Sequence, residues 1–239
     1  MSTLARMSSV SARRVAAGVV GLACVIGAVL IVWGRSEDGP SDSSVALRSS
    51  VRVTAFGCSR VGRIGVGAAV GDGLVATVAH VVAGSTEITV MTPDGEEVPA
   101  AVVAIDRERD LAVLDVDLAL PVLELGTPVA RSGGSYVVWR EDAAVVVDAE
   151  LTRLVSLTAP TIDHDETAVR KGIQIAAEVV SGDSGSIVVS GGRAVAMVFA
   201  RSTQSADRGW ATDVAELSPL LASLDGVAKP APVDVGACT

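Results

Sequence analysis

Two histidines occur among the 239 residues, so few side chains can act as a general base near neutral pH. His80 ends one apolar run, and Asp110 opens another. Ser184 lies in the segment Gly182-Asp183-Ser184-Gly185, where the glycines permit a sharp turn that exposes a hydroxyl group. Acyl transfer by a serine needs a base, a carboxylate that orients the base, and N–H donors for the oxyanion. Together these residues predict that chemistry, although each segment alone also suits an ordinary turn or strand end.

In chain order and with their flanking residues, His80, Asp110 and Ser184 resemble the motifs of chymotrypsin-like serine peptidases, most closely the bacterial HtrA (Deg-like) proteases. The resemblance covers most of residues 51–218, in blocks at 65–82, 90–114, 173–186 and 209–212. It implies that His80 accepts the Ser184 proton while Asp110 holds the imidazole. It also implies that the N–H groups of Gly182 and Ser184 form the oxyanion hole.

The resemblance implies an active serine endopeptidase that cleaves protein or peptide substrates through an acyl-enzyme, with no cofactor and no metal. No member of the triad is replaced. The alternative is a non-catalytic pseudoprotease, a membrane-tethered module that binds or senses peptides on the same fold. HtrA proteases usually continue into a PDZ domain, but only about 25 residues follow the last expected strand, so we expect no PDZ domain.

Two acidic residues near Ser184 have open roles. Glu178 stands six residues before Ser184, at the position that helps to floor the P1 pocket in the family. A carboxylate there favours basic P1 side chains, but a solvent-facing loop residue is the commoner situation for a glutamate. Asp183 directly precedes Ser184, and in some members of the family an aspartate at this position binds a newly cut amino terminus. The sequence does not identify the partner of Asp183 in this chain.

Short runs of valine and isoleucine, separated by glycine, aspartate and proline, are typical of antiparallel β-structure. A helix is expected at 214–223, with Asp213 as its N-cap and Glu216 completing a capping box. The fold class is therefore all-β, and the resemblance implies two six-stranded antiparallel barrels, about 51–126 and 127–212, with the active site between them. The expected strands are 51–56, 64–70, 73–78, 87–92, 98–105, 111–116, 134–139, 143–156, 172–176, 185–190, 193–200 and 208–212.

Residues 15–34 carry no charged side chain and, at about 1.5 Å per residue, are long enough to cross a bilayer as a helix. Arginines precede this segment and acidic residues follow it, which places residues 1–14 in the cytoplasm and the catalytic domain outside. A cleaved signal peptide and a lipoprotein site at Cys24 are less favoured, because the apolar run is long and continues well past Cys24. We therefore expect a cytoplasmic tail (1–14), a single-pass signal anchor (15–34), a linker (35–50), a protease domain (51–226) and a C-terminal tail (227–239).

The net charge is −9, and residues 1–34 contribute three arginines and no acid, so the remainder carries −12. A domain this acidic lacks the clustered basic side chains that bind phosphates, which excludes nucleic acid as a partner. The expected partners are peptide substrates and, through the N-terminal helix, the cell membrane. No feature of the sequence indicates an oligomeric state.

Cys58 and Cys238 are the cysteines outside the expected membrane segment, in a compartment that permits disulfides. A bond between them would fasten the C-terminal tail to the start of the domain and close a long loop. We favour this disulfide over two free thiols.

Two other patterns resemble ligand sites and are discarded. The glycines at 65, 67 and 71 approach a dinucleotide fingerprint, but a turn and another expected strand follow, with no helix to bind a pyrophosphate. Residues 163–166 (Asp-His-Asp-Glu) contain metal ligands, but no second histidine is near in the sequence, so a solvated loop is favoured.

Overall fold

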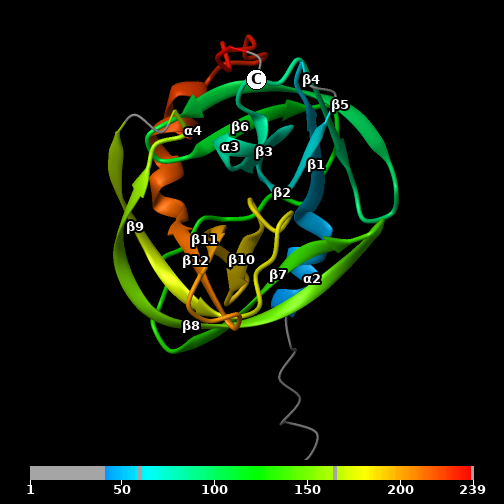
Figure 1. Ribbon diagram of the computed structural model, residues 1–239. Helices are drawn as coiled ribbons and strands as arrows, with labels where there is room; N and C mark the ends of the chain where they lie inside the picture. The colour runs from blue at the N-terminus through cyan, green and yellow to red at the C-terminus, as the bar shows by residue number, and fades with distance from the viewer. Residues whose placement is uncertain (1–40, 59–60, 164–165, 238–239) are drawn as a thin grey trace, which may run out of the picture. The chain divides into compact units, whose positions relative to one another are not determined.

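Antiparallel strands close into two barrels in the computed structural model, which describes residues 41–58, 61–163 and 166–237 (Figure 1). Within these ranges the first barrel has the strand order β1-β2-β3-β6-β5-β4 and the second has the order β10-β11-β12-β9-β8-β7. The expected mostly-β fold of two barrels is therefore confirmed. The first barrel comprises β1 (Ser50–Phe56), β2 (Gly62–Gly71), β3 (Leu74–Thr77), β4 (Glu87–Met91), β5 (Glu97–Asp106) and β6 (Leu111–Val116). The second comprises β7 (Ser132–Arg140), β8 (Ala143–Pro160), β9 (Thr167–Ala176), β10 (Ile187–Ser190), β11 (Arg193–Arg201) and β12 (Arg208–Asp213).

Small aliphatic side chains fill the barrels. On β1, Val51, Val53 and Ala55 are fully buried and alternate with more exposed residues, because successive side chains of a strand point to opposite faces. One cluster of buried residues joins the two barrels, since it contains Val66 of β2 and Met197 of β11. A shared core of this kind holds the barrels in a fixed relation, which a site assembled from both requires.

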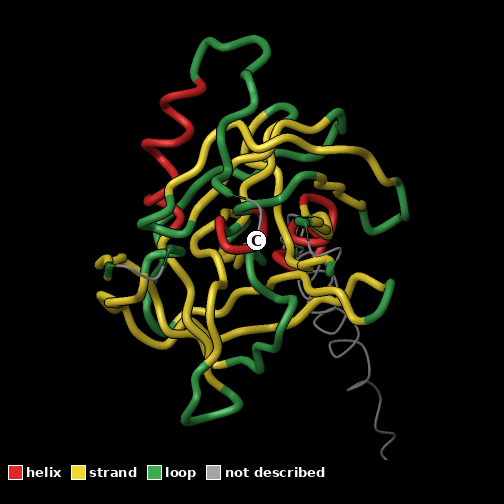
Figure 2. Tube along the Cα trace, turned by 45° about the horizontal axis from the view of Figure 1, so that its top comes forward, coloured by secondary structure: helices red, strands yellow, loops and turns green. Residues whose placement is uncertain are grey.

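Among the described residues, helix is confined to short segments, as Figure 2 shows. The expected helix near the C-terminus is confirmed, but it has two parts: the 3₁₀ helix η1 (Val214–Leu217) and the helix α4 (Ser218–Leu224). Pro219 lies in the first turn of α4, where its missing N–H is not needed. Asp213 does cap η1, accepting from the Ala215 N–H at 2.9 Å. The capping box is wrong, because Glu216 instead pairs with Arg109 at 2.9 Å.

Helix α2 (Asp42–Ser49) is a finding that the sequence did not predict, since its residues were assigned to a polar linker. Ser41 caps the helix, and Ala46 and Ser49 are buried. The Asp42 carboxylate accepts hydrogen bonds from the backbone N–H groups of residues 191 and 192, at 3.1 and 2.7 Å, in the turn between β10 and β11. This segment is therefore part of the folded domain.

The expected membrane anchor lies outside the described residues. Among the residues that the structure does describe, no helix is both long and apolar enough to cross a membrane. The tail after α4 is attached to the first barrel, since Val233 N–H donates to the Val102 carbonyl at 2.9 Å and Gly84 N–H donates to the Val235 carbonyl at 2.7 Å. Cys58 lies just after β1, but Cys238 is outside the described ranges, so their pairing stays a prediction.

Candidate active site

His80 and Asp110 meet at one end of the first barrel. His80 lies in the short helix α3 (Ala79–Val82), which follows β3, and Asp110 immediately precedes β6. Because β3 and β6 are antiparallel neighbours, these two ends lie side by side. The Asp110 carboxylate approaches His80 twice: Oδ2 lies 2.8 Å from Nδ1, and Oδ1 accepts the backbone N–H at 2.8 Å. This arrangement fixes the ring orientation and the tautomer with a proton on Nδ1.

The two side chains differ in exposure in the way that a general base requires. The Asp110 side chain is 7% exposed and that of His80 is 40% exposed, so the far edge of the imidazole stays accessible. Asp110 has a φ of 58°, a left-handed conformation that aspartate tolerates better than most residues. The turn before it is held by Asp106, whose carboxylate accepts the N–H groups of Glu108 and Arg109 at 3.0 and 2.8 Å.

Ser184 lies in a tight turn between β9 and β10, and two glycines adopt conformations that other residues rarely adopt. Gly182 has a φ of 97° and Gly185 has a φ of 92°. A Cβ atom on Gly185 would lie 1.9 Å from the Val66 carbonyl oxygen, so only glycine fits there. The Ser184 carbonyl accepts the Val66 N–H at 2.8 Å, which attaches the serine turn of the second barrel to β2 of the first.

The serine turn also lies next to the histidine helix. A Cβ atom on Gly65 would lie 2.9 Å from the Ser184 carbonyl oxygen and 2.7 Å from the side chain of Val81, the residue after His80. The structure therefore brings all three predicted triad residues to the junction of the barrels. In the described part of the chain no hydrogen bond joins the Ser184 hydroxyl to His80.

The partner of Asp183 is Arg140, the last residue of β7. Its Nη1 and Nη2 atoms donate to the fully buried Asp183 carboxylate at 2.5 and 3.1 Å. Asp183 also accepts the Val180 N–H at 2.9 Å. The hydrogen bond that Arg140 donates to Asp183 raises the pKa of Arg140 above its ordinary value, so the guanidinium stays protonated. Sequence reasoning missed Arg140 because an isolated arginine at a strand end carries no motif.

A second arginine that the sequence did not single out lies behind the Asp110 carboxylate. Arg170 of β9 is 2% exposed, and its Nη1 lies 3.5 Å from Asp110 Oδ2. The guanidinium of Arg170 therefore reaches from the second barrel to the His80–Asp110 pair of the first barrel.

Glu178 is exposed and lines a hollow of about 440 Å³ with its neighbours in the chain and the β11–β12 connection. Arg201 lines the same hollow, so charges of both signs face it. The Glu178 carbonyl accepts the Tyr136 hydroxyl at 3.2 Å. Burial, together with the charge of Asp183, raises the pKa of Tyr136 to about 12.

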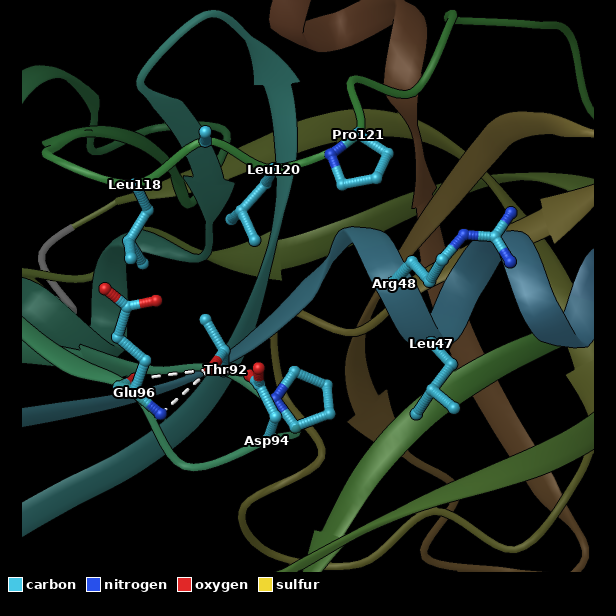
Figure 3. Close-up of a pocket in the computed structure, with 10 residues that line it drawn as sticks. Leu47, Arg48, Thr92, Asp94, Glu96, Leu118, Leu120 and Pro121 are labelled. Atoms are coloured by element: carbon cyan, nitrogen blue, oxygen red, sulfur yellow. Dashed lines mark hydrogen bonds between the residues drawn. The ribbon is translucent and has the colours of Figure 1, made fainter.

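A separate cavity of about 350 Å³ lies away from these residues (Figure 3). It is lined by Leu47 and Arg48 of α2, the β4–β5 turn and residues 118–121, and it contains none of the predicted site residues. Thr92 on its wall accepts the Glu96 N–H at 3.0 Å, which shapes the turn. This cavity is therefore distinct from the candidate active site.

The structure describes the glycine pattern in full, whereas residues 164 and 165 of the acidic pattern lie outside the described residues. The glycines at 65, 67 and 71 lie within strand β2 and form no phosphate-binding loop. Asp163 is bound by the guanidinium of Arg107. Among the residues that the structure describes, no cluster of histidine, cysteine and acidic side chains could hold a metal ion.

Comparisons with known proteins agree with this geometry. The family described as "Trypsin-like peptidase domain" matches residues 65–197, more than half of the chain. The serine protease Rv3671c of Mycobacterium tuberculosis is 31% identical over 180 residues, which cover 73% of this chain and 44% of the relative. A probable periplasmic serine endoprotease of Halomonas elongata, DegP-like, is 45% identical over 67 residues, covering 28% of this chain and 14% of that protein. The chain thus spans less than half the length of these curated relatives.

Solved structures show the same fold. The active form of the Rv3671c protease from M. tuberculosis has a TM-score of 0.73 and 28% sequence identity, covering 83% of this chain and 89% of that one. The HtrA-type protease AlgW with a tripeptide has a TM-score of 0.66 at 22% identity, covering 77% of this chain and 62% of that one, and supports the fold alone. With the family match over more than half of its length, this chain belongs to the trypsin-like peptidases.

Proposed function

We propose that this chain is a serine endopeptidase with His80, Asp110 and Ser184 as its catalytic triad. The observation that carries the proposal is the double contact of Asp110 with His80, at 2.8 Å to both the ring Nδ1 and the backbone N–H. A partly exposed histidine held by a buried carboxylate in this way is prepared to accept a proton on Nε2. Membership of the trypsin-like peptidase family supports the same assignment.

The chemistry is acyl transfer in two half-reactions. Ser184 Oγ attacks the scissile carbonyl carbon while His80 Nε2 accepts the hydroxyl proton, and Asp110 stabilises the resulting imidazolium. The imidazolium gives this proton to the leaving amine as the C–N bond breaks, which leaves the acyl group on Ser184. A water then attacks the acyl carbon, His80 accepts the proton of the water, and the proton returns to Ser184 Oγ as the acid product leaves.

The oxyanion of each tetrahedral intermediate would accept hydrogen bonds from the Gly182 and Ser184 N–H groups. Two observations support this role. A Cβ atom on Gly182 would meet no other atom within 4 Å, so the turn is open on that side. The residue between the two donors, Asp183, is fixed by Arg140, so the donors need not reorganise during the reaction.

The hollow beside Glu178 is our proposed P1 pocket. It borders the segment that leads to Ser184 and the β11–β12 connection. A carboxylate on its wall favours substrates with lysine or arginine at P1, while Arg201 on the same wall opposes that preference.

We place the domain outside the cytoplasm, on a single-pass anchor at residues 15–34. The uncharged length of that segment and the arginines before it support this placement. The relative from H. elongata, named a probable periplasmic endoprotease, gives further support for an extracytoplasmic location.

Fluorophosphonate labelling of the purified full-length chain at neutral pH tests the triad. We expect labelling that is lost in Ser184→Ala and kept in Ser190→Ala, a serine on the exposed end of β10 whose hydroxyl donates to the Gly133 carbonyl. Peptide hydrolysis should follow the same pattern. If folded protein shows no Ser184-dependent labelling under either reducing or oxidising conditions, the chain is a peptide-binding module and the proposal is wrong.

A further inference from the structure

We propose that Arg170 is a positioning residue of the catalytic triad: from the second barrel it holds the Asp110 carboxylate in place against His80. This inference rests on the proposed triad. It assigns a role to a residue of β9 that lies outside the sequence blocks that carry the family resemblance.

The guanidinium of Arg170 is fixed on several sides. Its Nη1 lies 3.5 Å from Asp110 Oδ2. Its Nε donates to the Glu108 carbonyl at 3.1 Å, and its Nη2 donates to the Pro160 carbonyl at 3.2 Å. Its central carbon stands 5.5 Å from the centre of the Phe199 ring, a cation–π contact from β11. A side chain held this firmly can position the group that it contacts.

Burial explains why the contact with Asp110 matters. Arg170 is among the largest fully buried side chains of the domain, and a buried guanidinium is costly unless a negative charge and hydrogen-bond acceptors compensate it. Within the described ranges, Asp110 is the carboxylate with which Arg170 forms an ion pair. The positive charge of Arg170 in turn attracts and orients the carboxylate that faces His80 Nδ1.

The arrangement also joins the two halves of the site. Asp110 and the Glu108 carbonyl belong to the first barrel, whereas Arg170 and Phe199 belong to the second. Asp110 has a strained φ of 58°, and such a conformation persists only where its surroundings fix it. Arg170 therefore helps to hold the Asp110 turn against the barrel that carries Ser184.

The shared oxygen has an electrostatic consequence. Asp110 Oδ2 contacts both the permanent charge of Arg170 and the ring of His80, so Arg170 partly neutralises the carboxylate and disfavours the imidazolium. Other cations near His80 have different attachments: Arg63 of β2 donates to the His80 carbonyl at 3.3 Å, and Arg107 binds Asp163. Arg109 pairs with Asp106 and Glu216. Removal of Arg170 alone should therefore favour protonation of His80.

The test compares Arg170→Gln, Arg170→Lys and the surface control Arg193→Gln, whose arginine pairs with Glu124. Active sites are titrated with a fluorophosphonate, and kcat, KM and the pH dependence of kcat/KM are measured on a peptide substrate. For Arg170→Gln we expect kcat per titrated site to fall about tenfold or more with little change in KM. We also expect the acid limb of the profile to move to higher pH by about half a unit or more.

Arg170→Lys should keep the acid limb near its wild-type position, because the charge remains, and should recover part of kcat. An unchanged kcat per titrated site and an unchanged acid limb in Arg170→Gln, with only the thermal stability lowered, would overturn the inference. If Arg170→Gln does not fold, Arg170→Lys decides, since an ammonium cannot reproduce the fork to Glu108 and Asp110, and a wild-type kcat would then contradict us. Absence of Ser184-dependent labelling in the wild-type chain would instead refute the proposed function itself.

Discussion

Arg140 donates hydrogen bonds from both terminal nitrogens of its guanidinium to the carboxylate of Asp183, at 2.5 and 3.1 Å. Asp183 directly precedes Ser184, the candidate nucleophile. The family resemblance leaves open whether a newly cut amino terminus must fill this position. Arg140 fills it from within the folded domain, so the serine turn has its compensating cation without cleavage. Asp183 is fully buried, which makes the cation necessary.

We expect Arg140→Met to slow fluorophosphonate labelling of Ser184 about tenfold or more, because the turn that carries the proposed oxyanion donors loses its anchor. The free energy of unfolding should fall by about 1–3 kcal/mol. The loss stays moderate because the Arg140 side chain is 40% exposed, and water replaces part of the interaction. Urea unfolding and labelling kinetics measure the two effects. Arg193→Met, which breaks a surface pair with Glu124, is the control, and equal labelling rates in both variants would contradict the prediction.

Gly185→Ala should abolish labelling and destabilise the domain by more than about 2 kcal/mol. Its Cβ would lie 1.9 Å from the Val66 carbonyl oxygen, at a φ of 92°. Gly191→Ala is the matched control, since Gly191 also has a positive φ, 60°, but its Cβ would meet no atom within 4 Å. The control should lose a smaller amount of stability and keep its activity. Labelling of a folded Gly185→Ala protein at the wild-type rate would show that the close approach to Val66 is not required.

Tyr136 gives a direct spectroscopic reading of the packing beneath the serine turn, because it is the one tyrosine in the sequence. Its pKa is raised to about 12, first by burial and then by the charge of Asp183. Since the folded state binds this proton more tightly than the unfolded state, the associated stability is present below about pH 10 and is lost as the pH rises toward 12. Absorbance at the tyrosinate wavelength should show a midpoint near 12 in the folded protein and near 10 in urea. A midpoint near 10 in folded protein would refute the burial argument.

Glu178→Ala should lower kcat/KM for substrates with arginine or lysine at P1 more than for substrates with alanine or valine. The reason is the loss of the acidic side chain from the wall of the hollow next to the serine segment. Arg201→Ala tests the opposite charge on the same wall and should favour basic substrates. Equal effects of Glu178→Ala on both substrate classes would defeat the proposed P1 pocket.

A disulfide between Cys58 and Cys238 should appear as a linked peptide in mass spectra of a non-reduced digest. The tail is already attached to the first barrel through the backbones of Val233 and Val235, which limits where its end can lie. The bond would close a long loop and stabilise the domain by about 4–5 kcal/mol in the chain-entropy treatment. Two unlinked cysteine peptides would disprove the pairing.

The fold was largely predictable, and the reason lies in the local pattern. Strands of valine and isoleucine between glycine and aspartate turns carry their own signal, and the glycines around Ser184 require the turn that the structure shows. The β10 strand begins at Ile187, two residues later than expected, because Gly185 still belongs to that turn. Helix α2 was missed because serine and aspartate residues suit a linker as well as a helix start.

The two arginines could not be predicted. Arg140 and Arg170 act through contacts with residues 43 and 60 positions away in the chain, and nothing in their local sequence distinguishes them from surface arginines. Arg170 even stands beside Lys171 in a strand with exposed neighbours. Glu216 was misassigned for the same reason, since its partner Arg109 is distant in sequence.

The hydrogen bond from the Val66 N–H to the Ser184 carbonyl, and the close contact of Gly185 with the same residue, make the serine turn depend on a strand of the opposite barrel. A nascent chain in which only the first barrel has folded contains the base and no nucleophile. A second barrel folded alone lacks the surface on which its serine turn closes. If His80, Asp110 and Ser184 act as proposed, proteolytic activity therefore requires both barrels to be folded and docked against each other.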